Sequence, residues 1–264
     1  MLSNKDHSSP AGFAFRASRF ALSSLALFLL NSSAFAAPAT TLPPVVERAL
    51  ETMERSDQEG YAYRMSKTEA ASTEVAIFDP AKPEGQTWRL LQKDGKTPTA
   101  KEMEEFRKER AEREKKRVEQ KKESKSKGKG DKELREMIAP ESVQLISETA
   151  ERATYRFKMR ADDEDAKKFA DAVRGTLVIA KAAPHVESLD LASTGEIKPM
   201  TGVKIAEFHL ALTFLPPDAY GQALPASVHS VVRGRAMLVK KLDQDATITF
   251  SDYARRASPV TPAR

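Results

Sequence analysis

Hydrophobic and polar residues alternate along most of the chain after residue 60, which is the pattern of β-strands with one buried face. The clearest example lies at 152–159, where Ala153, Tyr155, Phe157 and Met159 alternate with polar residues. Together the alternating stretches predict about ten strands, at 61–66, 74–78, 86–92, 143–146, 152–159, 175–181, 186–191, 203–215, 228–240 and 246–253. A tight turn at 243–245 is expected to join the last two.

Two short stretches have helical spacing instead. At 45–54, apolar residues recur every three or four positions after Pro43-Pro44, which predicts an amphipathic helix. A second short helix is predicted at 164–173, with Phe169 toward the core. The acidic residues at 162–165 suit the start of that helix because its dipole favours negative charge there, and they lack the spacing of a calcium loop.

A long charged segment separates the third and fourth predicted strands. Thr99 and Glu102 have the spacing of a capping box, so a helix is expected from Lys101 to Lys122. It has almost no apolar face apart from Phe106 and Val118, which predicts a helix that is solvated nearly all round. The Gly-rich stretch 123–131 is expected to be flexible.

These elements predict one domain at 37–256, interrupted by a charged insertion at 99–136 and followed by a loose tail at 257–264. Short connections favour antiparallel, meander-type strand order. The expected fold is α+β and mostly β, a curved antiparallel half-barrel sheet with short helices over its concave face. So many strands offer more apolar surface than two short helices can fill, so a cavity is expected between them.

The first 36 residues have the features of a cleavable signal peptide. Three basic residues precede an eleven-residue apolar run, Phe20–Leu30, and Ala34 and Ala36 supply the small side chains of a cleavage site. Cleavage is expected after Ala36, with Ala37 as the alternative. A membrane-spanning helix needs about 20 apolar residues, so a membrane anchor is disfavoured. The mature chain is therefore expected to be soluble and periplasmic or secreted.

Charge and composition exclude several functions. The formal net charge is +5, but segment 101–136 alone holds fifteen Lys or Arg and eleven Asp or Glu. The basic charge thus belongs to the leader and this segment, which argues against a nucleic-acid-binding surface on the fold. The chain has no cysteine. It therefore has neither disulfides nor the acylated cysteine of a lipoprotein.

The sequence contains no catalytic or metal-binding constellation. His185, His209 and His229 lie on separate predicted strands, so each is interpreted as solvent-facing or singly hydrogen-bonded rather than as a metal ligand. The chain has no nucleophile elbow and no phosphate-binding glycine loop. We therefore expect a protein that is not an enzyme and that uses no cofactor and no metal.

One strand and its ending resemble a known family. The stretch Gly175-Thr-Leu-Val-Ile-Ala-Lys181, followed by Pro184, is similar to a Gly-x-Leu-x-hydrophobic strand and Pro break in the LolA-like periplasmic lipoprotein carriers. The order of elements, with a signal peptide, a first amphipathic helix and a Tyr-rich first strand, resembles them too. The resemblance implies an unclosed half-barrel with helices over its concave side. The carriers have an aromatic and basic cluster where this chain has His185-Val186-Glu187, so a lipid or other apolar ligand is favoured over a lipoprotein.

We therefore predict an exported, non-enzymatic binding or carrier protein for a lipid or other apolar molecule. The residues expected to line the concave face are large and apolar; residue by residue, ordinary core packing is the alternative. They are Tyr61, Tyr63, Trp88, Tyr155, Phe157, Phe208, Leu210, Leu212 and Phe214. The alternative function is a structural or adaptor protein that recruits a protein partner, or meets an anionic membrane surface, through the charged 101–136 arm.

Overall fold

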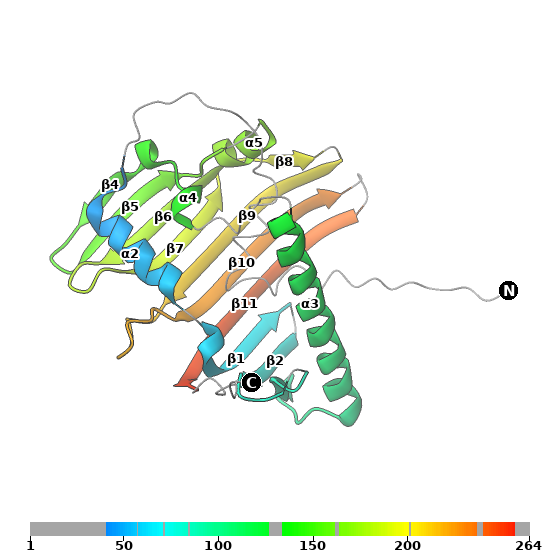
Figure 1. Cartoon of the computed structure of the whole chain (residues 1–264). Coiled ribbons are helices and arrows are strands. Elements are labelled where there is room, and N and C mark those ends of the chain that lie inside the picture. Colours follow the sequence, from blue (N-terminus) through cyan, green and yellow to red (C-terminus); the bar gives the residue numbers. More distant parts are fainter. Residues whose placement is uncertain are drawn as a thin grey trace.

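The computed structural model describes residues 41–56, 58–70, 72–83, 85–126, 134–161, 164–200, 202–236 and 240–256. The predicted signal peptide, its cleavage site, the tail 257–264 and most of the stretch expected to be flexible lie outside these residues. Figure 1 shows the arrangement of the elements.

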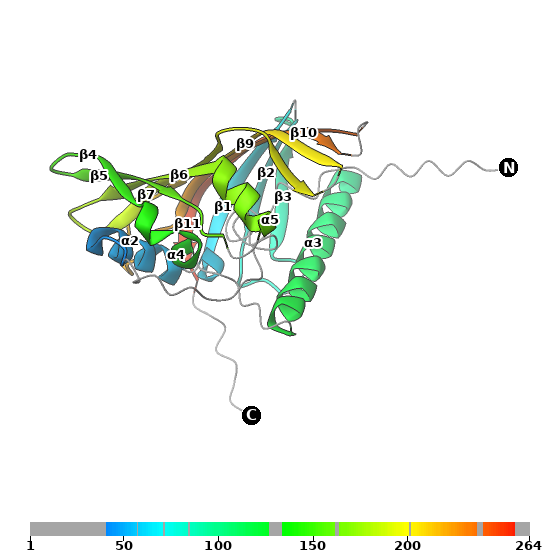
Figure 2. The same cartoon turned by 90° about the horizontal axis from the view of Figure 1, so that it is seen from above.

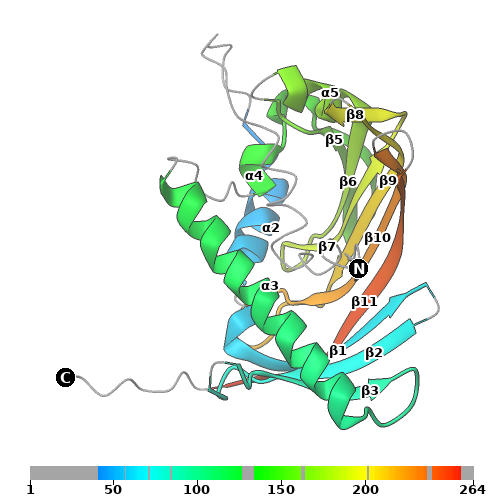
Figure 3. The same cartoon turned by 90° about the vertical axis from the view of Figure 1, so that its right-hand side faces the viewer.

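The described residues form one antiparallel sheet. Its strands are β1 (Tyr61–Glu69), β2 (Ser72–Phe78), β3 (Trp88–Lys93), β4 (Gln144–Glu148), β5 (Arg152–Lys158), β6 (Val173–Ala180), β7 (His185–Ser193), β8 (Ile197–Met200), β9 (Val203–Phe214), β10 (Pro225–Ala236) and β11 (Lys240–Arg255). Their order is β3-β2-β1-β11-β10-β9-β7-β6-β5-β4, and β8 pairs with β9. The sheet is curved and does not close, because β3 and β4 are its two free edges (Figure 3). The predicted mostly β fold with a curved, open antiparallel sheet is confirmed.

The first and last described strands, β1 and β11, are neighbours inside this sheet. β1 pairs with β11 from Tyr61↔Arg255 to Glu69↔Ala246. The sheet therefore consists of two meanders, β1–β3 and β4–β11, which are joined where β1 pairs with β11. The chain must pass from one edge of the sheet at β3 to the opposite edge at β4.

The helices among the described residues are α2 (Pro44–Arg55), α3 (Ala100–Ser126), α4 (Leu134–Met137) and α5 (Glu164–Ala172). Single 3-10 turns lie at Gln58–Gly60 and Pro140–Ser142. α2 packs on β6, β7 and α4, α5 packs on β6 and β8, and α3 packs on β3. α2, α3 and α4 lie on the concave side of the sheet (Figures 2 and 3). Among the described residues, no helix has the length and apolarity needed to cross a membrane.

α2 forms where the sequence predicts it. Pro44 stands in its first turn, where a missing N–H costs no hydrogen bond. Val46, Ala49 and Leu50 form its buried stripe, and all three are fully buried. The helix thus covers the strands at the β4 end of the sheet.

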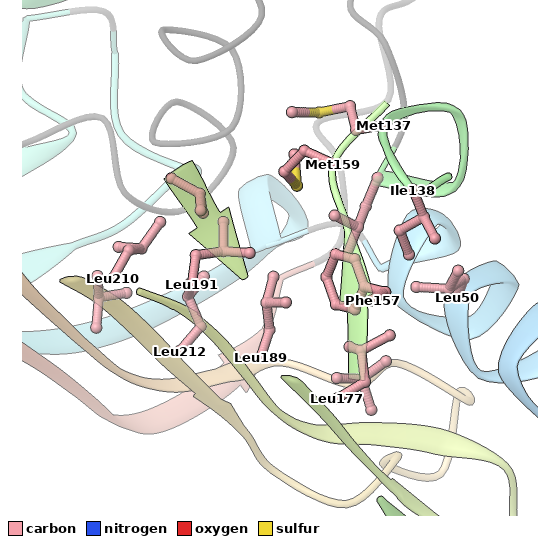
Figure 4. Packing of buried hydrophobic residues seen from close by; sticks show 14 of the residues in the cluster. Leu50, Met137, Ile138, Phe157, Met159, Leu177, Leu189, Leu191, Leu210 and Leu212 are labelled. Atoms are coloured by element: carbon pink, nitrogen blue, oxygen red, sulfur yellow. The ribbon is translucent and has the colours of Figure 1, made fainter. Parts of the chain in front are cut away.

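The hydrophobic core is best defined beneath α2 and α4. Phe157 and Leu177 from the sheet meet Leu50 of α2 and Met137 and Ile138 around α4 (Figure 4). Each of these side chains has a relative exposure of 1% or less. This end of the concave face is therefore packed.

A row of paired residues continues the concave face across the sheet. Its members are direct cross-strand neighbours: Ile248, Val228, Leu212, Leu189, Leu177 and Tyr155. All six are buried. At the other end of the row, Ile248 pairs with Lys67 of β1, so the apolar row ends at a charged side chain.

α3 is the connection between the two edges of the sheet. It has 27 residues, which gives a length of about 40 Å. Ten flat strands would span about 43 Å, and a curved sheet spans less from edge to edge. The helix leaves β3 and runs on the concave side toward α4 (Figure 3). The long charged segment is thus the link that carries the chain across the concave opening.

The predicted capping box begins this helix. The Thr99 N–H donates to Oε2 of Glu102 at 2.8 Å, and the Glu102 N–H donates to Oγ1 of Thr99 at 3.3 Å. α3 continues through Ser126, so the expected flexible stretch does not start at Glu123. The remainder of that stretch, from residue 127, lies outside the described residues.

One local prediction is wrong, and one short strand was missed. Residues 243–245 do not turn but lie within β11, where Asp243 and Asp245 pair with Arg233 and Val231 of β10. The polar residues mistaken for a turn belong to the exposed face of a strand. The short strand β8 was not predicted, although its Ile197 is buried at 1% exposure.

A bulge also changes the face that β9 presents at its start. The register between β9 and β10 shifts between Arg233 and Gly234, so Ile205 packs against the core and Ala206 is exposed. A Cβ at Gly234 would lie 2.2 Å from the Lys204 carbonyl oxygen. Glycine is therefore required at this bulge.

Candidate functional site

Five aromatic side chains gather on the concave face near the β3 edge. We call Tyr63, Phe78, Trp88, Phe250 and Tyr253 the aromatic patch. The Tyr63 ring is at its centre, with ring centroids 5.1 Å from Phe78, 5.8 Å from Trp88, 5.7 Å from Phe250 and 5.4 Å from Tyr253. Tyr63 is buried and the other four are half-buried. The patch therefore keeps part of its apolar surface accessible.

Strand pairing accounts for the assembly of the patch. Tyr63 of β1 pairs with Phe78 of β2, and Phe78 pairs with Trp88 of β3. Direct cross-strand neighbours have their side chains on the same face of the sheet. On the other side of β1, Met65 pairs with Phe250 of β11.

Tyr253 joins the patch through an irregularity in β11. Asp252 has a φ of 56°, and the pairing of β1 with β11 shifts register between Ala62 and Arg64. The Tyr253 hydroxyl donates to the Pro225 carbonyl at 2.8 Å and accepts from Nε2 of Gln58 at 3.0 Å. Burial raises the pKa of Tyr253 far above its ordinary value, so the phenol stays neutral.

α3 covers the edge of this patch with a narrow stripe. Among the α3 side chains that the structure describes, Phe106 and Arg110 are buried, at 5% and 8% exposure, and Arg113 continues the same face. Positions 106, 110 and 113 are one helical turn apart. The rest of the described α3 surface is mainly exposed and charged. Burial in the described part of α3 is thus concentrated in a narrow stripe.

Arg110 places a cation among aromatic rings. Its Cζ lies 4.1 Å from the centroid of the Trp88 ring and 4.7 Å from that of Phe106, which is cation–π geometry. Its Nη2 lies 3.9 Å from Sδ of Met65. Burial, assisted by the nearby charge of Arg113, lowers the pKa of Arg110 to about 9. The side chain is still positively charged at neutral pH.

A second buried cation belongs to β1 and lies on the concave face of the sheet. Lys67 is 8% exposed and forms an ion pair with Glu69. It lies two residues beyond Met65, so its side chain shares the concave face with Tyr63 and Met65. Lys67, Arg110 and His185 are the described polar or charged residues that are buried. Two of these three are long basic side chains on the concave side of the sheet, Lys67 from β1 and Arg110 from α3.

The structure divides the predicted lining residues into several environments. Tyr63 and Trp88 belong to the aromatic patch. Tyr155 and Phe157 belong to the packed core at the other end of the sheet. Leu210 and Leu212 lie between them, buried at 3% and 4% exposure. These residues share the concave side, where they belong to one hydrophobic cluster or pack against it.

The other three predicted residues lie near the margins of the concave face. Phe208 is half-buried, with its ring centroid 5.7 Å from that of Phe169 in α5. Phe214 is half-buried and packs against the core cluster. Tyr61 is buried beside Tyr253, and its hydroxyl donates to Oδ2 of Asp218 at 2.5 Å. Burial and this bond raise the pKa of Tyr61 to about 12.

Sequence analysis missed Arg110, Phe78, Phe250 and Tyr253 as site residues. Phe78 and Phe250 were within predicted strands, and their alternation with polar neighbours was a usable signal. The irregularity at Asp252 shifts the position of Tyr253, and no pattern in the sequence predicts this irregularity. Arg110 is one of many basic residues in a helix without an apolar face, so only the packing identifies it.

A shallow hollow of about 370 Å³ lies elsewhere, at the end of α2. It is lined by Thr52, Ala183, Pro184, Pro217, Tyr220, Gly221 and Gln222. Asp218 fixes the adjoining loop, because its Oδ1 accepts from the N–H groups of Tyr220 and Gln222 at 2.8 and 3.0 Å. The hollow is open and lacks ionisable side chains other than the exposed Tyr220. It is therefore a weaker candidate than the aromatic patch.

The histidines considered in the sequence analysis, His185, His209 and His229, each have one hydrogen-bond partner. Nε2 of His209 lies 2.6 Å from Asp190, Nε2 of His229 lies 3.1 Å from Asp245, and Nδ1 of His185 lies 2.7 Å from the Ala183 carbonyl. The sequence did not predict that the rings of His209 and His229 would meet, with centroids 5.8 Å apart. In the described part of the chain, no group of three or more His, Cys, Asp or Glu is arranged to hold a metal ion.

Comparisons with known proteins give no indication of function, so the function has to be inferred from the geometry of the structure. No family model matches the chain, and no curated protein and no solved structure is detectably similar to it.

Proposed function

We propose that this chain is an exported, non-enzymatic binding or carrier protein for a lipid or other apolar molecule. The ligand lies on the concave face, between the aromatic patch and α3. The observation that carries the proposal is a set of half-buried aromatic rings beneath a charged helix that is attached by a narrow stripe.

The aromatic patch supplies the binding energy. Burial of apolar surface stabilises a complex by roughly 25 cal/mol per Å², before the cost of association is subtracted. Trp88, Phe78 and Phe250 are half-buried, so each has apolar surface left to bury. Large aromatic side chains contribute strongly at such sites because they are rigid and bury a large area.

α3 supplies the entrance. A helix with few buried apolar contacts opens at a lower free energy than the rest of the fold. Phe106 and Arg110 hold α3 against β3, while α2 and α4 close the opposite end of the sheet with fully buried side chains. A ligand therefore enters at the α3 side, and the packed end serves as the rigid support.

The predicted export and the family resemblance both support this role. The first 36 residues have the pattern of a signal peptide, which is typical of an exported chain. An apolar molecule that leaves a membrane needs a protein surface to shield it from water. The similarity of Gly175–Lys181 and Pro184 to the LolA-like carriers favours an acyl chain as the apolar group.

The proposal is tested by extracting the purified mature protein with organic solvent and analysing the extract by mass spectrometry. A fluorescent fatty acid is then titrated into the delipidated protein. We expect a co-purified lipid or saturable uptake of the probe. Consistent absence of both contradicts the proposal.

A matched pair of variants locates the site. Phe250 is half-buried on the concave face, and its neighbour Thr249 is exposed on the opposite face. Phe250→Ala is expected to weaken probe binding about tenfold, because roughly half of a large side chain is lost from the contact. Thr249→Ala is expected to leave binding unchanged. Equal effects of the two variants place the probe outside the aromatic patch.

A further inference from the structure

The hollow at the end of α2 is held open by bonds within its own walls. These walls are Thr52 of α2, the turn 183–184 and the loop 217–222. The Thr52 hydroxyl lies 3.2 Å from the Pro184 carbonyl oxygen, which fixes the turn against α2. The Asp218 carboxylate fixes the loop, because it accepts from the Tyr61 hydroxyl and from two N–H groups of the loop. A site that is already formed loses little freedom when it binds a partner.

The walls of the hollow suit an extended segment that contains proline. Pro184, Pro217 and Tyr220 supply two pyrrolidine rings and one aromatic ring. Tyr220 is 61% exposed, more than any other large hydrophobic side chain that the structure describes. Grooves lined by aromatic rings bind polyproline II segments, because such segments are extended beforehand and lose little entropy on binding.

A segment of this kind follows β11 in the sequence. Residues 257–264 lie outside the described part of the chain, and Pro259 and Pro262 within them have Pro-x-x-Pro spacing. A polyproline II helix has three residues per turn, so residues at this spacing share one side of it. Both proline rings can therefore meet the same surface.

The end of β11 lies beside the hollow. Cζ of Arg255 is 3.9 Å from the centroid of the Tyr220 ring. The next N–H, that of Arg256, donates to the Gly60 carbonyl at 3.0 Å, so the point from which 257–264 departs is fixed. Three residues of polyproline II span about 9 Å, which is the reach from Arg256 to Pro259. The first of the two prolines thus comes within reach of Tyr220.

We propose that segment 257–264 of this chain docks in the hollow, with Pro259 and Pro262 against the wall formed by Tyr220. The proposal does not depend on the lipid site at the aromatic patch. A short tether gives an effective concentration of roughly millimolar, so even a contact with a Kd of about 1 mM is substantially populated within the chain. Docking connects the end of β11 to α2 and to the loop 217–222.

Disulfide trapping tests this contact on the full mature chain, which has no cysteine of its own. One double variant combines Val260→Cys with Ala183→Cys in the wall of the hollow. The control combines Val260→Cys with Lys82→Cys, an exposed position outside the hollow. Lys82 is also near the start of the segment, because its N–H donates to the carbonyl of Asp79, whose carboxylate lies 3.7 Å from Arg256.

Under mild oxidation, the disulfide at 183 is expected to form about tenfold faster than the disulfide at 82, because docking raises the local concentration of residue 260 at the hollow. Equal rates, or faster trapping at 82, overturn the inference. A disulfide that forms between two chains rather than within one also overturns it, since the hollow then holds the segment of a second copy.

Substitutions then assign the preference to the two sides of the contact. Tyr220→Ala, and separately Pro259→Ser with Pro262→Ser, are expected to reduce trapping at 183 to the rate at 82. Leu215→Ala is the control, because Leu215 is exposed in the same connection between β9 and β10 but does not line the hollow. It is expected to keep the preference. A preference for 183 that survives Tyr220→Ala contradicts the proposed contact.

Discussion

The ring of Phe157 lies over the backbone of Gly175, its direct partner on the neighbouring strand. A Cβ built on Gly175 would lie 2.1 Å from Cζ of Phe157. Phe157 is 1% exposed and is packed beneath α2, so the ring has no free space to move into. Glycine at this position is therefore a packing requirement of the core.

Gly175→Ala is expected to destabilise the protein by about 1–3 kcal/mol, the usual cost of an overpacked core. Urea unfolding at neutral pH measures this free energy. Gly195→Ala is the matched control, since nothing lies within 4 Å of a Cβ at that position. Its effect is expected to stay within about 0.5 kcal/mol. Equal stability of the two variants contradicts the account of the Phe157 packing.

Phe106→Ala is expected to loosen α3 without unfolding the sheet. Removal of a buried Phe costs about 3–5 kcal/mol, and here most of that cost falls on the docking of one helix. Hydrogen exchange measures it, and the protection of the α3 amides is expected to fall about 100-fold or more.

Met103→Ala provides the control on the same helix, because Met103 is 37% exposed. Its effect on exchange is expected to be small. If Phe106→Ala leaves the α3 amides as protected as in the wild type, the helix is held by other contacts, and the entrance proposed at the α3 side is not supported.

The raised pKa of Tyr61 makes the folding stability of the protein depend on pH in the alkaline range. Its pKa in the folded protein is about 12, above the ordinary value near 10. Above pH 10 the unfolded chain releases this proton while the folded chain keeps it. The unfolded state is therefore stabilised relative to the folded state. The contribution of Tyr61 is therefore complete below pH 10 and is lost as the pH rises toward 12.

The corresponding variant is Tyr61→Phe, which removes the hydroxyl and its bond to Asp218. It is expected to be about 1–2 kcal/mol less stable than the wild type at pH 7. Its deficit is expected to shrink between pH 10 and pH 12, as measured by urea unfolding at several pH values. A deficit that stays constant over this range is the opposing result.

The exposed charges of α3 distinguish a binding site from a recruiting arm. Deletion of 101–136 is not informative, because α3 connects the two edges of the sheet. The double variant Glu104→Gln with Lys108→Gln removes one exposed ion pair and keeps the net charge. We expect lipid binding to be unchanged and the stability to be almost unaffected, because an exposed ion pair contributes little. Loss of lipid binding in this variant contradicts a ligand site on the sheet side of α3.

The sequence predicts the strands well because most have one buried face. The alternation at 152–159 persists in β5, where Ala153, Tyr155 and Phe157 are buried and the residues between them face outward. The prediction failed where polar residues line the outer face of a long strand, as at 243–245. The pairing of β1 with β11 depends on contacts far apart in the chain, which no local pattern contains.

The site was only partly predictable for the same reason. Tyr63 and Trp88 were chosen as large aromatics on strands, and the structure brings them together. Tyr155 and Phe157 have the same sequence features but lie under α2 and α4, where they fill the core. The path of α3 from β3 to the far edge decides which aromatics remain accessible, and that path is a property of the whole fold.

Trp88 is the chain's only tryptophan and lies in the aromatic patch beneath Arg110. Its fluorescence therefore reports directly on the proposed site, and a dibrominated fatty acid is the probe because bromine quenches only at close range. We predict saturable quenching of Trp88 by the brominated acid, reversed by the unbrominated one. If Trp88 fluorescence stays unchanged while the probe binds, or if no saturable binding occurs, the concave aromatic patch is not the ligand site.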